Sequence, residues 1–351
     1  MEEIRRSGIS RRESLGMAAA LAGAAAIPAA AMAGDKAAGM GTPLFRTTVD
    51  FRDPLWNRDT YARIDGELDF TRQKVSRLTG KVFGVRDNEK VRPLFGIDGF
   101  SVVRTQRLPD GNWRRLLKEI VFYRDLQTGR IMTSWANPYT GEAVRVVPIA
   151  NDPFNYDIRD TYPEPPSYGG LNTAKPAPRP FLLDWSETGD GTLILETGID
   201  LFYPAALQPA QWPRESAGTY NRVSEHFLYF VQRADVENPA LTALPVKGSW
   251  SRITPWLPWM LMGQAPGFIH YFTHFATIRD GIDGLPRDLV EAAKAIAPGY
   301  LEAPTQDYGP SLSSIENYAR TEKPAPVPPG WTAPLPPAAA PPLPPFLRPR
   351  E

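Results

Sequence analysis

From about Phe100 onward, hydrophobic and polar residues alternate with a period of two, which is typical of β-strands with one buried face. Short glycine-containing turns such as "PDGN", "LQTGR" and "PYTGE" separate the first of these runs. Connections this short join antiparallel neighbours, because a parallel crossover needs about a dozen residues. The runs predict a mainly β protein with strands at residues 100–108, 113–125, 131–137, 143–150, 179–186, 192–203, 219–236, 248–253 and 267–278.

An antiparallel meander of this length favours a closed β-barrel of the lipocalin or calycin type. Closure removes the exposed edges at which strands of separate molecules pair. A barrel of about eight to ten strands can also hold a small ligand inside. We therefore predict a β-barrel with a binding cavity.

Helices are expected at both ends of this barrel. Residues 53–80 carry apolar side chains at Tyr61, Ile64 and Leu68, which predicts one or two short N-terminal helices. Residues 286–296 begin with a proline, which is favoured in the first turn, and predict a C-terminal helix.

Three segments fall outside the periodic pattern. Residues 151–180 are rich in Pro, Tyr, Asn and Asp, and a long loop of this kind predicts a lid over the barrel. Residues 323–351 are almost all Pro and Ala, which predicts an extended, disordered tail outside the fold. The remaining segment, residues 1–33, is treated as a leader, so that residues 34–322 form a single β-barrel domain.

The leader has the three parts of a signal peptide. Arg11 and Arg12 stand directly before the small apolar run "GMAAALAGAAAIPAAAMAG", which ends in an Ala-x-Ala cleavage signal at Ala33. The paired arginines indicate the twin-arginine export machinery as a partner and the periplasm as the destination. Pro28 and the weak hydrophobicity of the run argue against a stable membrane span.

Composition narrows the chemistry. Lys plus Arg and Asp plus Glu both number 39, so no basic surface for nucleic acid is indicated. Cysteine is absent, which excludes disulfides, thiolate catalysis and cysteine-based metal sites. The chain also lacks a glycine-rich phosphate loop and a dinucleotide-binding fingerprint, and we expect no cofactor.

Two stretches of the chain resemble a known family. "WRRLLKEIVFYRDLQTGRIMTSWANPYTGEAVRVVPIANDPFN", from Trp113, and "SWSRITPWLPWMLMGQAPG", from Ser249, are similar to the bacterial family numbered eighteen-thirty-eight among the domains of unknown function. The similarity covers nearly all of the chain between the leader and the Pro-rich segment. It implies an exported, single-domain protein and carries over no reaction.

The histidines are the first catalytic candidates. The chain has three, so any imidazole base is His226, His270 or His274. On a strand, His270 and His274 face the same side about 13 Å apart, too far to share one metal ion, and we predict no metal site. A metal ion bound by His226 with one of these histidines and carboxylates is the alternative. A structural role on an apolar strand face is the alternative for each histidine.

Carboxylates and polar side chains complete the candidate list. Glu225 lies on a rather apolar strand face together with Tyr229, which suits a catalytic carboxylate and a ligand contact. Asp152 and Asn155 flank the start of the long loop, where Asp152 is either catalytic or the cap of an Asx turn. Arg104 either pairs with a carboxylate or binds an anionic ligand.

An irregular loop, "TPWLPWMLMGQAPG", gathers aromatic and sulfur-containing side chains between two predicted strands. It is too short to span a bilayer. It either plugs one end of the barrel or lines a pocket through Trp256, Trp259 and Met262, with shallow membrane contact as a third reading.

Together these features predict a cofactor-independent enzyme that acts on a hydrophobic, aromatic small molecule by lyase- or isomerase-type acid–base chemistry. A periplasmic, lipocalin-like carrier without catalysis is the alternative. A protein-interaction module that uses the Pro-rich tail is a third hypothesis.

Overall fold

The computed structural model describes residues 44–153, 155–162, 177–307 and 312–339, with the backbone alone for residues 151–153. Within this part, ten strands form one antiparallel sheet and two form a separate hairpin, which confirms a mainly β protein. The strands are β1 (Lys74–Val85), β2 (Arg92–Arg107), β3 (Trp113–Arg124), β4 (Ser134–Ala136), β5 (Ala143–Arg145), β6 (Ile149–Pro153), β7 (Tyr156–Ile158), β8 (Asp184–Glu187), β9 (Thr192–Pro204), β10 (Tyr220–Gln232), β11 (Lys247–Thr254) and β12 (Phe268–Thr277). The helices are α1 (Pro54–Asp65), α2 (Arg233–Val236), α3 (Arg287–Ile296) and α4 (Ser314–Thr321), with 3-10 turns η1 (Pro258–Met260), η2 (Gly281–Gly284) and η3 (Pro298–Tyr300).

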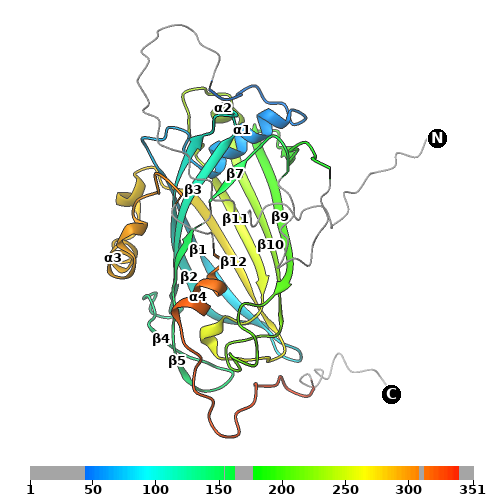
Figure 1. Ribbon diagram of the computed structural model, residues 1–351, viewed down its shortest axis with the longest axis vertical. Helices are drawn as coiled ribbons and strands as arrows, with labels where there is room; N and C mark the ends of the chain where they lie inside the picture. The colour runs from blue at the N-terminus through cyan, green and yellow to red at the C-terminus, as the bar shows by residue number, and fades with distance from the viewer. Residues whose placement is uncertain (1–43, 154, 163–176, 308–311, 340–351) are drawn as a thin grey trace, which may run out of the picture.

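The large sheet runs in the order β6-β3-β2-β1-β12-β11-β10-β9-β8, with β7 paired to β3 beside β6. It wraps around a common interior along the long axis of the molecule (Figure 1). In the described residues no ladder of strands joins β8 to β6 or β7, so the sheet keeps a seam between its two ends.

Two contacts cross or cover this seam. Near its upper end, an isolated bridge pairs Thr161 with Pro180, with a hydrogen bond from the backbone N of Phe181 to Asp160 O at 2.8 Å. Lower down, Asn317 of α4 donates through Nδ2 to the carbonyl of Ala150 in β6 (2.9 Å).

Helix α4 reaches the other side of the seam as well. Its Tyr318 ring packs edge-on against Trp212, in the loop that follows β9, at 5.9 Å between centroids. The helix begins with a capping box in which Ser313 and Glu316 satisfy each other's backbone N–H groups. That capping signal is present in the sequence, although the periodicity of the chain did not predict the helix.

Helix α1 closes the upper end of the interior (Figure 1). Asp53 caps it by accepting a hydrogen bond from the N–H of Leu55, and proline occupies the first turn. The helix buries Trp56, Tyr61 and Ile64 against a hydrophobic cluster at this end of the sheet. The cluster also contains residues near the ends of three strands: Trp113 of β3, Leu193 and Leu195 of β9, and Val231 of β10.

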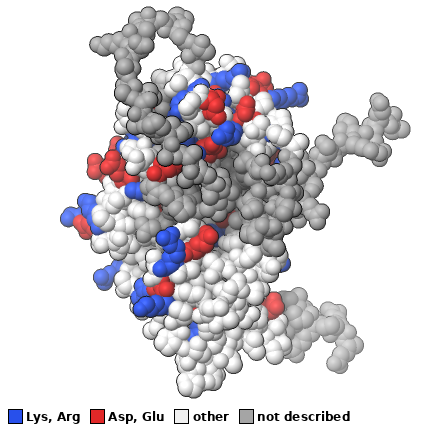
Figure 2. Space-filling view, in the orientation of Figure 1, with Lys and Arg blue, Asp and Glu red and all other residues white. Residues whose placement is uncertain are grey.

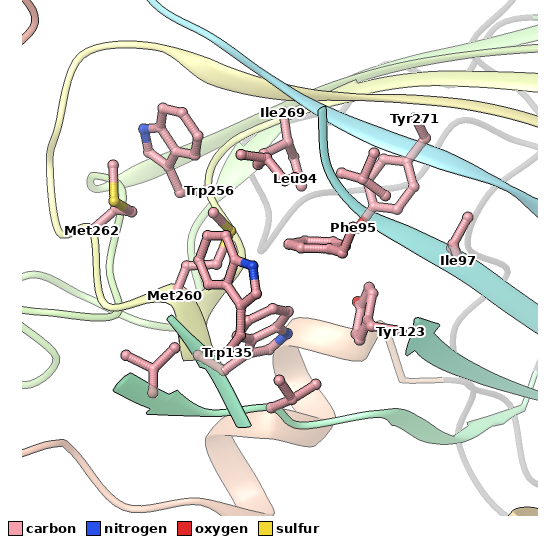
Figure 3. Close-up of a cluster of buried hydrophobic side chains, with 14 of the residues drawn as sticks. Leu94, Phe95, Ile97, Tyr123, Trp135, Trp256, Met260, Met262, Ile269 and Tyr271 are labelled. Atoms are coloured by element: carbon pink, nitrogen blue, oxygen red, sulfur yellow. The ribbon is translucent and has the colours of Figure 1, made fainter. Parts of the chain in front are cut away.

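A second cluster, which we call the plug, closes the lower end (Figure 3). Its centre is the Trp- and Met-rich loop, where Trp256, Trp259, Met260 and Met262 are all 4% exposed or less. They pack against Phe95, Ile97, Tyr123, Trp135, Ile269 and Tyr271. The described contacts of this loop are those of a packed hydrophobic cluster.

The outer face of β1, β2 and β3 is covered by α3, which confirms the helix predicted near residues 286–296. Leu289 and Ala293 of α3 are fully buried there. Beneath them Asp98 is also fully buried and forms ion pairs with Arg77 (2.9 Å) and Arg124 (2.7 Å). This side of the sheet is structural.

Strand β1 replaces part of the helix predicted for residues 53–80, because the helix ends at Asp65. Its inward positions mix Lys74, Ser76, Leu78 and Gly80, which hides the alternation of a strand. A side chain at Gly80 would lie 2.4 Å from the carbonyl oxygen of Phe272, so glycine permits close pairing with β12. Pairing on both sides therefore selects the strand. In addition, β4 and β5 form their own hairpin and do not extend the large sheet.

The first part of the Pro-rich segment lies against the lower end of the molecule; we call residues 323–339 the strap. Ala325 donates its N–H to Glu215 (2.5 Å), and Arg214 donates to the carbonyl of Pro326 (3.0 Å). The ring of Trp331 stacks under the Arg214 guanidinium at 5.5 Å. These contacts involve residues 323–339 of the tail that the sequence predicted outside the fold, and residues 340–351 lie outside the described residues. Charged residues are sparse over the lower part of the face in Figure 2.

Candidate functional site

The two faces of the strands carry different chemistry. In the register of β10, β11 and β12, Glu225 lies opposite Arg252 on the inward face, and His226 lies opposite Ser251 on the outward face. His270 and His274 also point outward. All three histidines of the chain therefore stand on the face opposite to Glu225.

The outward histidines have few partners. His226 and His274 are exposed, and His226 contacts the hydroxyl of Ser224 at 3.2 Å. His270 is half-buried beside Ser251 (2.9 Å), and burial lowers the pKa of its imidazole. Neither His270 nor His274 lines the interior, which had been left open by the sequence.

Six inward side chains form a polar layer between the α1 cluster and the plug. We call this layer the belt, and its members are Arg115, Glu119, Glu225, Tyr229, Trp250 and Arg252. All six are half-buried, whereas the centre of the plug is fully buried. The belt is therefore less completely buried than the centre of the plug.

Glu119 and Glu225 come from strands far apart in the sheet. Between β3 and β10 the sheet order places β2, β1, β12 and β11. The two carboxyl groups nevertheless interact electrostatically, and the charge of Arg252 also acts on Glu119 by lowering its pKa. The curvature of the sheet thus brings β3 and β10 to face each other across the interior.

Glu119 is held in a form that can carry a proton near neutral pH. Burial raises the pKa of its carboxyl group to about 7, opposed by the Arg115 cation and reinforced by Glu225. No hydrogen bond to this carboxyl group is found among the described residues. Glu119 is therefore both protonatable and unengaged in that part of the chain.

Glu225 has a different environment. It accepts a hydrogen bond from the indole Nε1 of Trp250 at 2.9 Å, and its other oxygen lies 3.6 Å from a guanidinium nitrogen of Arg252. These donors suit a carboxylate that accepts hydrogen bonds. The two facing carboxyl groups consequently differ in their partners.

Arg115 is fixed from above by the end of α1. Its Nε lies 2.7 Å from one oxygen of Asp65, and its terminal nitrogen donates to the other at 3.1 Å. The hydroxyl of Tyr156 also donates to Asp65 (2.5 Å) and lies 3.4 Å from that of Tyr61. This network fixes the Arg115 guanidinium on the inward face of β3, the face that also carries Glu119.

The opposite wall of the belt is aromatic. Phe227 and Trp250 stack at 6.2 Å between centroids with 23° between their planes, and Tyr229 packs on Phe275 at 5.3 Å. These four side chains are half-buried. This wall therefore presents aromatic ring faces to the interior.

The comparison with known families places the chain. The family model described as protein of unknown function, DUF1838, matches residues 72–322. The chain belongs to this family. The match confirms the resemblance seen in the two stretches and includes the six belt residues, while Asp65 precedes it. No curated protein matches the chain.

Two further findings on this DUF1838 protein concern metal binding and membrane-spanning helices. Among the described residues, no group of His, Asp or Glu side chains is arranged to hold a metal ion. In the same part of the chain, no helix has the length and apolar character needed to cross a membrane.

The other sequence candidates are dispersed. Asp152 lies in β6 opposite Glu119, but its side chain is outside the described part of the chain, as is most of the predicted lid. Asn155 accepts a hydrogen bond from the N–H of Leu117 (3.3 Å) near the same edge. Trp256, Trp259 and Met262 are in the plug.

Arg104 lies on the outer face. It donates through Nε to the carbonyl of Arg72 (3.1 Å) and also to that of Ala303, and thereby anchors the segment after η3. Of the candidate side chains, Glu225 and Tyr229 share the inward face of β10. The structure does not bring Arg104 or the histidines to them.

Sequence reasoning missed Glu119, Arg115, Trp250 and Arg252. A signal for the first two existed, because "WRRLLKEIVFYR" places Arg115 and Glu119 on one strand face with Trp113 and Leu117. The other face of this strand carries charges as well, so the pattern did not reveal which charges point inward.

Proposed function

We propose that this DUF1838 protein is a cofactor-independent enzyme of the lyase or isomerase type, with Glu119 and Glu225 as its acid and base. The observation that supports this most is the pair of facing carboxyl groups with unlike partners. Glu119 is half-buried and has a pKa of about 7, whereas Glu225 is held by Trp250 and Arg252. A general acid works best when its pKa lies near the working pH.

The substrate in this proposal is a small, hydrophobic, aromatic molecule. The aromatic wall of Phe227 and Trp250 supports a flat ligand, and the charges of the belt support an uncharged one. Arg115 is balanced by Asp65 and Arg252 by Glu225. A ligand with a net charge would be left without a partner in the half-buried interior.

In this proposal the wrapped sheet works as a closed barrel of the lipocalin type. The bridge between Thr161 and Pro180 supports closure at the top of the seam, and α4 supports it below. Enclosure would keep water from the reacting atoms. Export by the twin-arginine route to the periplasm also stays a proposal, because the leader lies outside the described residues.

Proton transfer to and from carbon can be tested before the substrate is known. The purified full chain is incubated in D2O with an apolar extract of the source cells, and the extract is then analysed by mass spectrometry. We expect at least one compound to gain deuterium with the wild-type protein, and E119Q and E225Q to abolish the gain. Equal deuterium gain with wild type and both variants would contradict the proposal.

A carrier without catalysis is the second candidate, and the half-buried aromatic wall favours it, because stacking needs no acid or base. Native mass spectrometry separates the two functions. A carrier would bind the same compound in wild type and E119Q, and neither protein would introduce deuterium.

A further inference from the structure

We propose that the substrate is an uncharged, planar carbonyl compound with a C–H bond next to the carbonyl group, and that the belt converts it to its enol. This inference rests on the proposed function and specifies its substrate class. Its basis is the placement of one protonatable and one ion-paired carboxyl group on facing strands, with an aromatic wall beside the second.

The side of the belt that carries Glu119 suits a ligand oxygen that accepts a hydrogen bond. Arg115 is engaged by both oxygens of Asp65, and Glu119 meets no hydrogen-bond partner among the described residues. In this proposal Glu119 donates its proton to the ligand. A carbonyl oxygen gains negative charge as its neighbouring C–H bond breaks, so a hydrogen bond from Glu119 strengthens in the transition state.

The base side of the belt suits removal of a proton from carbon. Glu225 is positioned by Trp250 and Arg252, and its strand places Phe227 two residues further along the same face. A ring stacked on Phe227 therefore lies beside the carboxylate. One wall of the interior thus supplies the aromatic stacking surface and the base, and the facing wall supplies the acid.

The step is balanced with these two groups alone. Glu225 takes the proton from the carbon next to the carbonyl, and the electron pair of that C–H bond forms the C=C bond. The C=O π electrons move to oxygen, which takes the proton of Glu119. For an isomerase, Glu225 then returns its proton to another carbon of the conjugated system while Glu119 recovers the enol proton.

The probe for the test is 1-tetralone, an uncharged aromatic ketone with exchangeable C–H bonds next to its carbonyl. Deuterium incorporation at that carbon is followed by proton NMR in D2O at neutral pH with the purified full chain. We expect exchange at least ~100-fold faster than in buffer, the scale of general acid–base catalysis. E119Q and E225Q should each lose most of this acceleration.

Controls separate chemistry from folding. H226N alters the outward neighbour of Glu225 and should exchange at the wild-type rate. E119D keeps a carboxyl group and should retain part of the acceleration even if E119Q folds poorly. Tetralin lacks the carbonyl group, and its weaker quenching of tryptophan fluorescence would show that the oxygen contributes to binding.

Failure of this substrate class can be distinguished from failure of the enzyme. If 1-tetralone does not bind, or binds without faster exchange, the carbonyl assignment is overturned. If a compound of the cell extract still gains deuterium with wild type but not with E119Q, the proposed acid–base function survives. If no compound does, both proposals fall together.

Discussion

The plug and the belt are two sections of one interior that share strand β3, and they gather side chains of opposite character. The plug packs Trp256, Trp259 and Met260 against other apolar side chains and leaves them 4% exposed or less. The belt places Glu119, Glu225 and two arginines on the interior surface and leaves them half-buried. Dense aromatic packing stabilises the lower end, whereas the belt gathers charged groups that are less completely buried.

The difference teaches that clustering along the chain is a poor guide to the site. The Trp- and Met-rich loop is conspicuous in the sequence and serves as packing in its described contacts. The belt is assembled from β3, β10 and β11, which contribute two inward residues each. Only the curvature of the sheet brings these residues together.

The largest effect is expected for a truncation in the plug. Trp259 contacts Phe95, Tyr123 and Trp135, and W259A should lower the free energy of unfolding by about 3–5 kcal/mol because it leaves a cavity. W250F in the belt should cost about 1 kcal/mol, chiefly the hydrogen bond to Glu225. Urea unfolding followed by circular dichroism measures both. Equal losses would mean that the belt is packed like the plug.

A smaller effect is expected from the strap, which extends the plug at its outer side. Deletion of residues 323–351 removes the contacts of Trp331 and Pro326 with Arg214, and should lower the free energy of unfolding by about 1–3 kcal/mol. Deletion of residues 340–351 is the matched control and should cost much less. Thermal unfolding of the two truncated chains measures both losses of stability. Equal losses of stability in the two chains would refute a stabilising strap.

The smallest effect is expected on the outward face. The triple variant H226N/H270N/H274N should change the free energy of unfolding by less than about 0.5 kcal/mol, since two of the three side chains are exposed. Its deuterium exchange with 1-tetralone should match that of wild type. Loss of deuterium exchange in this variant would mean that at least one histidine takes part in the reaction. It would contradict the assignment of the chemistry to the inward strand face alone.

Much of the fold followed from the sequence, because local patterns carry it. The period-two runs and short turns predicted β3, β9, β10, β11 and β12, and the proline at the start of its first turn marked α3. Strand β1 was missed because Lys74, Ser76 and Gly80 interrupt its inward face. Its conformation depends on pairing with β2 and β12, which no local signal encodes.

The candidate site was predicted only in part, for a related reason. Alternation places Glu225 and His226 on opposite faces, but it does not say which face points inward. Glu119 is ordinary in its local sequence, and its raised pKa arises chiefly from burial, reinforced by Glu225 across the interior and opposed by Arg115. Such long-range electrostatics appear only once the sheet has wrapped.

The most direct test of the account is the pH dependence of stability that Glu119 confers. Its pKa is about 7 in the folded protein and has a reference value of 4.5, so the folded state binds one more proton between these values. Stability from this proton is full below about pH 4.5 and is lost as the pH rises to about 7, at about 1.4 kcal/mol per pH unit. Urea unfolding from pH 4.5 to 8 should show this decline in wild type relative to E119Q, and a level difference above pH 7. A constant difference between the two proteins over the whole range would contradict a protonated Glu119 and, with it, the belt as an acid–base site.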